Sequence, residues 1–424
     1  MADLVFAFDA ALDRPIPVPP GAPAAVVEVV ATAPWAALQV AASAARQARA
    51  AALVLFGSTL DPLRASPAQA AQLRGLITGL AADGCRTIWL ADEAAECANI
   101  ARALAEPESL SFVTPVSPLR LEVRGVSVEI CSARGPAFAA TSAGQMLPSF
   151  ASAHTSLLPA QRRFVIGWDD VWSGLHGEAA ATHGLHAPLP ASHHALGSFF
   201  IWGTRALQPA PAGVHQIPAL QARSSHEASA GMCAAITLTN LTTPVPGLIA
   251  SGLAGGLSTL AGAAEIRSDL RTDWREVPTH RVAWRTLSIT SLAGGDEELA
   301  TAIWSALEGM SIDAQAPLQI VRCAIDCGGS ISRRVHVGEI SAETLARLRQ
   351  LYDPRSFRAW CQELEADRGE TLAVLVRNAS AAKSGETASF ASALAELVLE
   401  SETTGSHHAT REAAWLALEL MEST

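Results

Sequence analysis

The sequence is poor in lysine and in positive charge. Lys383 is its only lysine, and 30 basic residues stand against 41 acidic ones, which gives the 424-residue chain a net charge of −11. Proteins that bind nucleic acid through their own charge usually present a basic face. We therefore expect this chain to bind DNA only weakly or through a partner.

Long apolar runs are also missing, although 49% of the residues are hydrophobic. A membrane-spanning helix needs about 20 consecutive apolar residues, and the most apolar glycine-rich stretch, residues 246–264, is interrupted by glycine, serine and threonine. The first residues carry neither a basic segment nor a cleavage site of the kind that marks secretion. These absences predict a cytoplasmic protein with no membrane span.

The cysteines show no disulfide pattern. There are seven of them, an odd number scattered along the chain, which is typical of reduced, buried thiols in a cytoplasmic protein. Cys323 and Cys327 form a lone C-x3-C inside an apolar run. Core packing is favoured over a metal or redox pair because no second pair accompanies it.

What the sequence does contain is an alternation of short apolar segments with helical ones. Strands are expected at Leu4–Phe8, Leu53–Phe56 and Arg86–Leu90, with helices between them. Ser66 and Gln69 have the spacing of a capping box, and the proline between them suits the first helical position. Strand–helix–strand units of this size predict an α/β sandwich.

The pattern changes after residue 108. Arg124-Gly125 joins two apolar segments and predicts a β-hairpin. Further strands are expected at 163–167, 198–202 and 232–238. We predict four regions: a first domain at 1–240, a linker or insertion at 241–275, a small α+β domain at 276–340 and a helical region at 341–424.

The smaller regions have their own expected elements. The α+β domain should hold strands at 282–289, 319–325 and 333–338 and a helix at 297–307. The C-terminal region should hold helices at 341–351, 354–365, 389–399 and 410–421.

Five sites that follow apolar strands carry the chemistry of interest. In chain order they are Asp9-Ala10-Ala11, Gly57-Ser58-Thr59-Leu60-Asp61, Ala91-Asp92-Glu93-Ala94, Asp169 and Gly203-Thr204-Arg205-Ala206. Their order and strand contexts resemble the metal-binding motifs of the calcineurin-like metallophosphoesterases, and among these the SbcD-type DNA double-strand-break repair exonucleases. A later segment, Gln221-Ala222-Arg223 with Glu227, resembles a further signature of that family.

The resemblance also identifies what has changed. The motif positions that should supply metal ligands are occupied by Asp9, Ala11, Ser58, Asp92, Asp169, Thr204 and Ala206. Only Asp9 keeps the family's residue. Two-metal hydrolysis needs carboxylate, carboxamide and imidazole ligands around cations about 3.5 to 4 Å apart, and alanine offers no lone pair. Ser58 stands where the carboxylate that bridges both metals should be.

The resemblance therefore implies a fold, and it implies that most metal ligands are absent. The implied fold is a metallophosphoesterase-like β-sandwich flanked by helices, with a small α+β cap and C-terminal helices. Family members use two manganese ions, form homodimers and pair with an SMC-like coiled-coil ATPase. Because the ligands are mostly absent, we expect no cofactor and no catalytic residue, and the leading hypothesis is a scaffold or regulatory subunit without activity.

The resemblance also implies a docking element in the C-terminal region. Apolar residues there have amphipathic spacing; they are Leu345, Leu348, Leu351, Phe357, Trp360 and Leu364. An equal alternative is that these side chains pack within the chain itself.

Several alternatives stay open. Asp9 is either an ordinary polar residue that ends a strand or a remnant of function. Asp61, Arg205 and Arg223 are candidate binding residues; Arg205 suits a phosphate, although a surface ion pair is favoured. The acidic Asp169-Asp170 pair is interpreted as a solvated turn.

Two rival functions are also kept. The first is a divergent hydrolase with a single metal on Asp9, Asp61, Asp92 and Asp169. The second is a nucleic-acid-binding module that uses the former active-site groove. Five histidines within residues 176–194 include His183-x-x-His186, which has zinc-ligand spacing; an exposed loop is favoured there.

Overall fold

The computed structural model of the chain divides into two compact units. The first contains Met1–Ala283 and Asp313–Leu318, and the second contains Trp284–Ile312 and Gln319–Thr424. The residues that the structure describes are 2–19, 21–132, 161–168, 198–205, 214–224, 227, 230–241, 269–290, 296–310, 316–326, 341–350, 359–366 and 393.

A six-stranded mixed sheet forms the centre of the first unit. Its strands are β1 (Leu4–Phe8), β2 (Ala52–Phe56), β3 (Arg86–Leu90), β4 (Leu110–Val113), β10 (Met232–Leu241) and β11 (Asp269–Pro278). They lie in the order β11-β10-β1-β2-β3-β4. Strands β1 to β4 are parallel to one another, β10 pairs antiparallel with β1, and β11 pairs antiparallel with β10. The carboxyl ends of β1 to β4 therefore meet at one edge of the sheet.

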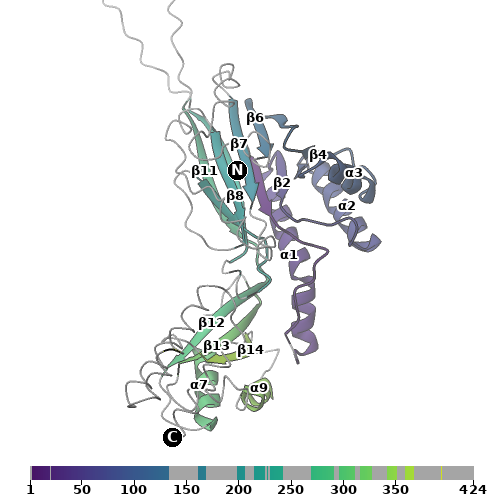
Figure 1. Cartoon of the computed structure of the whole chain (residues 1–424). Coiled ribbons are helices and arrows are strands. Elements are labelled where there is room, and N and C mark those ends of the chain that lie inside the picture. The colour runs from purple at the N-terminus through teal and green to yellow at the C-terminus, as the bar shows by residue number, and fades with distance from the viewer. Residues whose placement is uncertain are drawn as a thin grey trace, which may run out of the picture. The chain divides into compact units, whose positions relative to one another are not determined.

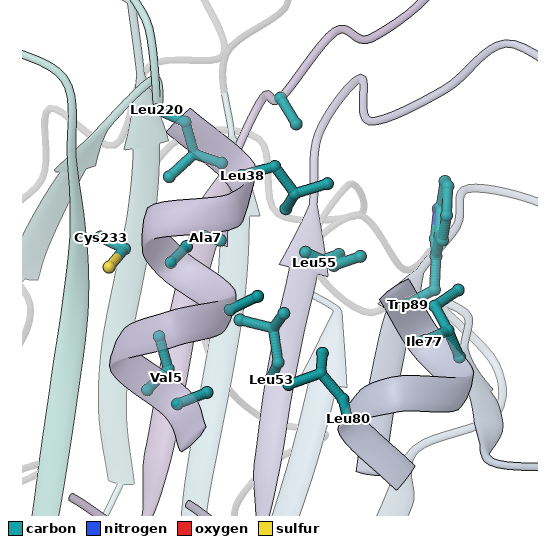
Figure 2. Packing of buried hydrophobic residues seen from close by; sticks show 14 of the residues in the cluster. Val5, Ala7, Leu38, Leu53, Leu55, Ile77, Leu80, Trp89, Leu220 and Cys233 are labelled. Carbon is teal, nitrogen blue, oxygen red and sulfur yellow. The ribbon is translucent and has the colours of Figure 1, made fainter. Parts of the chain in front are cut away.

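Three helices join these parallel strands: α1 (Ala24–Ala48), α2 (Pro67–Ala82) and α3 (Ala94–Ala103). They lie together on one face of the six-stranded sheet (Figure 1). Figure 2 shows Val5, Ala7, Leu53 and Leu55 of the sheet packing in the layer beneath the helices. Burial on both faces explains why β1 and β2 are apolar throughout rather than alternating.

The other face of the six-stranded sheet packs on a second sheet. This sheet has the order β5 (Leu119–Val123), β6 (Val126–Ser132), β7 (Gln161–Trp168), β8 (Ser198–Thr204) and β9 (Val214–Pro218). Leu4, Phe6 and Phe8 point into the layer between the sheets, where Phe6 contacts Phe164 at 5.5 Å between ring centroids. The α/β class is thereby confirmed.

Two local predictions are confirmed in this unit. Ser66 Oγ accepts from the Gln69 backbone N–H, and the Gln69 side chain accepts from the Ser66 N–H, which completes the capping box at the start of α2. Arg124 and Gly125 have φ angles of 50° and 76°, and they join β5 to β6 as an antiparallel hairpin. Two consecutive positive φ angles match the right-handed twist of the strands.

Helix α1 is the one helix among the described residues that is long and apolar enough to cross a membrane. Its second half, from Ala37 to Ala48, packs on the six-stranded sheet as part of the buried core. A buried core helix and a signal sequence near the N-terminus both satisfy this test of length and composition, and 39% of the apolar window of α1 is buried. Pro34 lies within the helix.

The second unit is a small α+β fold. Strands β12 (Val282–Thr290), β13 (Leu318–Asp326) and β14 (Ala359–Ala366) form one sheet in this order, with α7 (Asp296–Gly309) and α9 (Ser341–Gln350) in the connections. β13 and β14 are parallel. Ile303 and Leu307 of α7 pack against Val321 and Cys323 of β13. Cys323 is buried there, as core packing predicted.

Two predictions about this half of the chain are wrong. Residues 354–365 were expected to be a helix, but Ala359–Ala366 is strand β14, because pairing with β13 overrides a helical composition. Residues 241–275 were expected to be a linker or insertion; 242–268 lie outside the described residues, but Asp269–Pro278 is strand β11, which extends the first unit beyond residue 240. Edge strands carry charged residues that disfavour aggregation, and these hide the strand pattern of β11.

The expected strands at 282–289 and 319–325 and the expected helix at 297–307 are confirmed, and the expected helix at 341–351 is confirmed over its described residues, Ser341–Gln350. The segments 333–338, 389–399 and 410–421 lie almost entirely outside the described residues, which include only 393 among them.

Candidate functional site

The candidate site lies where the carboxyl ends of strands from both sheets meet. Asp9 follows β1, Gly57 and Ser58 follow β2, and Arg205 follows β8. Phe8 also forms an isolated parallel bridge to Ala219, just after β9. The two sheets of the first unit are thus joined at this edge.

Two glycines allow this close approach. A Cβ atom on Gly57 would lie 2.5 Å from the ring of Phe8, and one on Gly203 would lie 2.3 Å from the same ring. Gly57 also has a φ of 74°, which side chains disfavour. The Phe8 ring is buried, so it cannot retreat into solvent. Glycine at both positions brings the ends of β2 and β8 against β1.

The Asp9 carboxylate is bound by Arg205. Arg205 Nε donates to Asp9 Oδ2 at 2.6 Å, and Nη2 donates to Oδ1 at 2.7 Å. Only 1% of the Asp9 side chain and 6% of the Arg205 side chain are exposed. Two parallel charge-assisted bonds of this length form the strongest type of protein ion pair. The pair links the six-stranded sheet to the five-stranded sheet.

This pair answers two questions that the sequence left open. Arg205 was predicted to form a surface ion pair; an ion pair is present, but it is buried. Asp9 is not a solvated strand end, because its whole carboxylate is bound inside the unit. Asp9 has a φ of 54°, a conformation that aspartate tolerates better than most residues.

Backbone bonds join the loops that follow β1 and β2. Ala11 N–H donates to the carbonyl of Ser58 at 2.7 Å, and Leu12 N–H donates to that of Thr59 at 2.9 Å. Ala11 is fully buried with a φ of 45°. The loop therefore keeps its path through main-chain contacts, although Ala11 contributes no polar side chain.

Arg223 anchors the same loop from another part of the chain. Its guanidinium donates to the carbonyls of Ala11 (3.2 Å), Arg14 and Pro15 (3.0 Å). Burial lowers the pKa of Arg223 from its ordinary value, and the charge of Asp9 partly offsets this effect. The donors of this guanidinium are thus used to hold the loop backbone.

Glu227 closes the charged cluster. Its Oε2 accepts from the Arg223 backbone N–H at 2.7 Å. Burial raises the pKa of Glu227, while this bond and the charge of Arg205 act in the opposite direction. Asp9, Arg205, Arg223 and Glu227 thus form one set of opposite charges at the carboxyl edge.

The acidic side chains of the neighbouring loops bond to nearby backbone. Asp13 Oδ1 accepts from Asp61 N–H at 2.9 Å, and Asp61 Oδ1 accepts from Leu63 N–H at 2.9 Å. At the start of α3, the Glu96 side chain accepts from the Asp92 backbone N–H at 2.9 Å. Asp61 and Glu96 therefore help to shape the loops after β2 and β3.

A two-manganese centre does not fit these residues. Both Asp9 oxygens are bonded to Arg205, Ala11 has no donor atom, and Ser58 and Thr204 offer only neutral hydroxyls. Within the described part of the chain, no group of three or more His, Cys, Asp or Glu side chains is placed to hold a metal ion. Asp169, Ala206 and the histidines of 176–194 lie outside the described residues.

The expected docking residues are partly in the core of the second unit. Leu348 is 3% exposed and Trp360 2% exposed, and Leu345 packs against the same core as Leu348. Trp360 and Leu364 belong to strand β14 and not to a helix. Leu351 and Phe357 lie outside the described residues. The described members therefore favour packing within the chain.

Sequence reasoning missed two parts of the site. The Asp9–Arg205 pair was not predicted, although opposite charges directly after two strands were a usable signal. The role of Gln221 was also missed: its Oε1 accepts from Arg281 and Val282, and its Nε2 donates to the Ala222 and Val282 carbonyls. Gln221 thereby fixes the backbone that leads into β12.

Comparisons with known proteins identify no relative. No family model matches the chain, and no curated protein matches it. The resemblance to metallophosphoesterases therefore stays a prediction from the motif sites.

Proposed function

We propose that this chain is a phosphoesterase-like protein that has lost its catalytic centre and acts as a scaffold or regulatory subunit. The observation that carries the proposal is the Asp9–Arg205 pair. Asp9 is the one motif ligand kept by the sequence, and both of its oxygens are bonded to a side chain that brings its own positive charge. A metal ion at this carboxylate would have to displace a buried guanidinium.

The surrounding geometry supports the same conclusion. Hydrolysis by two metals requires a carboxylate that bridges the cations, and Ser58 occupies that motif position. The loops after β1 and β2 nevertheless keep a defined path through the Ala11–Ser58 and Leu12–Thr59 backbone bonds. A fold kept without its ligands is suited to binding and assembly.

The partner and the location belong to the same proposal. By resemblance, the partner is an SMC-like coiled-coil ATPase in the cytoplasm, with a homodimer of this chain as the assembling unit. The chain would bind DNA weakly or through that partner, because its net charge of −11 repels the phosphate backbone.

The loss of activity can be tested on the full chain. The protein would be purified, incubated with manganese, dialysed and analysed for bound metal, and then assayed on double-stranded DNA and on a chromogenic phosphodiester. We expect less than one metal ion per chain and no turnover above a matched Asp9→Asn variant. Two bound metals, or an activity that Asp9→Asn abolishes, would overturn the proposal.

The scaffold role needs a separate experiment. The full chain would be co-expressed with an SMC-like ATPase from the same genome and analysed by size-exclusion chromatography. Co-elution at a fixed ratio is expected. Separate elution of two folded proteins would refute the proposed partner, whatever the result of the metal analysis.

A further inference from the structure

The Asp9 carboxylate lies in a buried position, where an unpaired negative charge is disfavoured. Its side chain is 1% exposed, and its backbone is fixed by the bond from its N–H to the Phe56 carbonyl at 2.9 Å. An ionised carboxylate without a partner in such a position is strongly disfavoured. An ionised Asp9 at this edge therefore requires a cationic partner.

The bond geometry specifies which kind of cation fits. Arg205 approaches with Nε and Nη2 side by side, at 2.6 and 2.7 Å from the two carboxylate oxygens. A planar fork with two parallel donors matches a carboxylate in a way that the point charge of an ammonium group does not. Arg205 also comes from the opposite sheet, so the pair fastens the two sheets together.

The Arg223 guanidinium is not placed to take over this role. Arg223 lies in the same charged cluster, but it donates to the carbonyls of Ala11, Arg14 and Pro15. Moving it to Asp9 would release the loop after β1. The Asp9 site thus depends on Arg205.

We propose that Asp9 forms a binding site for a planar guanidinium cation, with the Arg205 side chain as its permanent occupant. The chain supplies this cation from its own sequence and needs no metal ion to hold the two sheets together here. Once the side chain is removed, the vacated site binds a free guanidinium-type ion. This inference depends on the geometry of the pair and not on the proposed function.

The test uses chemical rescue of an Arg205→Ala variant of the full chain. We expect its melting temperature to fall by roughly 10 °C, because a buried carboxylate loses its partner. Methylguanidinium, added at millimolar concentrations far below those that denature proteins, should recover part of the loss in a saturable manner. Ammonium at the same concentration should recover much less.

The matched control is the double variant Asp9→Asn with Arg205→Ala, which lacks both charges. Methylguanidinium should not stabilise it, because the site then carries no carboxylate. Equal stabilisation of both variants would overturn the inference, and so would a melting temperature of Arg205→Ala that equals that of the parent. Rescue by manganese but not by methylguanidinium would also overturn it.

A second variant keeps the inference testable if Arg205→Ala does not fold. Arg205→Lys retains the charge but cannot form both bonds, so it should melt clearly below the parent. A lysine variant as stable as the parent would show that the planar fork is not required.

Discussion

Replacing Gly57 with alanine should strongly destabilise the first unit, and the structure gives the reasons. A left-handed φ costs a residue with a side chain about 1 to 2 kcal/mol, and Gly57 has a φ of 74°. The new Cβ would also lie 2.5 Å from the Phe8 ring. Overpacking in a core costs about 1 to 3 kcal/mol, so the total is about 2 to 5 kcal/mol.

Two other glycines separate these contributions. Gly84 has a φ of 79° with no atom within 4 Å of an added Cβ, so Gly84→Ala should show the backbone cost alone. Gly203→Ala should show the steric cost alone, because its Cβ would meet the Phe8 ring at 2.3 Å and no positive φ is present. The ring cannot easily move, since it packs against Phe56 at 5.3 Å between centroids.

The free energy of unfolding would be measured by urea denaturation, followed by circular dichroism. We expect Gly57→Ala to cost more than Gly84→Ala, because it adds the contact with Phe8 to the same backbone cost. Adding Phe8→Leu should reduce the effect of Gly57→Ala in a double-mutant cycle. A Gly57→Ala variant no less stable than Gly84→Ala would refute the argument, because the contact with Phe8 would then carry no energy.

Other predictions concern helix propensity and pH. Gly75→Ala in α2 should raise the free energy of unfolding by about 0.5 to 1 kcal/mol, since no atom lies within 4 Å of the added Cβ. Gly79→Ala should raise it less in the same denaturation assay, because its Cβ would lie 2.8 Å from Arg46 Nη2. Burial alone would raise the pKa of Glu129, but its arginine partners outweigh burial and lower this pKa. Glu129 should therefore stabilise the fold above the usual carboxyl pKa, and melting curves of the parent and Glu129→Gln should converge as pH falls through the lowered value. Burial raises the pKa of Glu227, so ionising this carboxyl destabilises the fold. As the pH rises above the usual carboxyl pKa, the melting temperature of Glu227→Gln should therefore increase relative to that of the parent. A difference between the two melting temperatures that does not change with pH would contradict this.

The elements that depend on contacts between neighbouring residues could be predicted from the sequence. The capping box of Ser66 and Gln69 and the Arg124-Gly125 hairpin depend on residues within a few positions of one another. The strands β1 and β2 were predictable because a strand buried on both faces is apolar throughout. Such signals need no knowledge of distant contacts.

The elements that depend on contacts between distant residues were predicted wrongly or were not predicted. Residues 359–366 have a helical composition, yet pairing with β13 makes them a strand. Strand β11 lies at the edge of the six-stranded sheet and carries charged residues, so its pattern indicates a linker or insertion rather than a strand. The Asp9–Arg205 pair joins residues 196 positions apart, and only the packing of the two sheets brings them together.

The residues that match the phosphoesterase motifs and those that depart from them differ in what they contact. Arg223 and Gln221, which match, bind backbone atoms in other segments. Asp13 accepts from a backbone N–H, and Ser66 caps a helix. Backbone partners are unaffected by side-chain substitution, so these contacts do not depend on which side chain stands at a position such as Ala11.

The positions that depart from the motifs are those that would hold a metal if the proposed resemblance is correct. With a guanidinium bound at Asp9, ligands at the neighbouring positions would gain nothing from metal binding. Ala11 is then acceptable, because an apolar side chain suits a fully buried position better than an unpaired polar one. Under the function proposed above, the Arg205 guanidinium would account both for the carboxylate at Asp9 and for the absence of metal ligands around it.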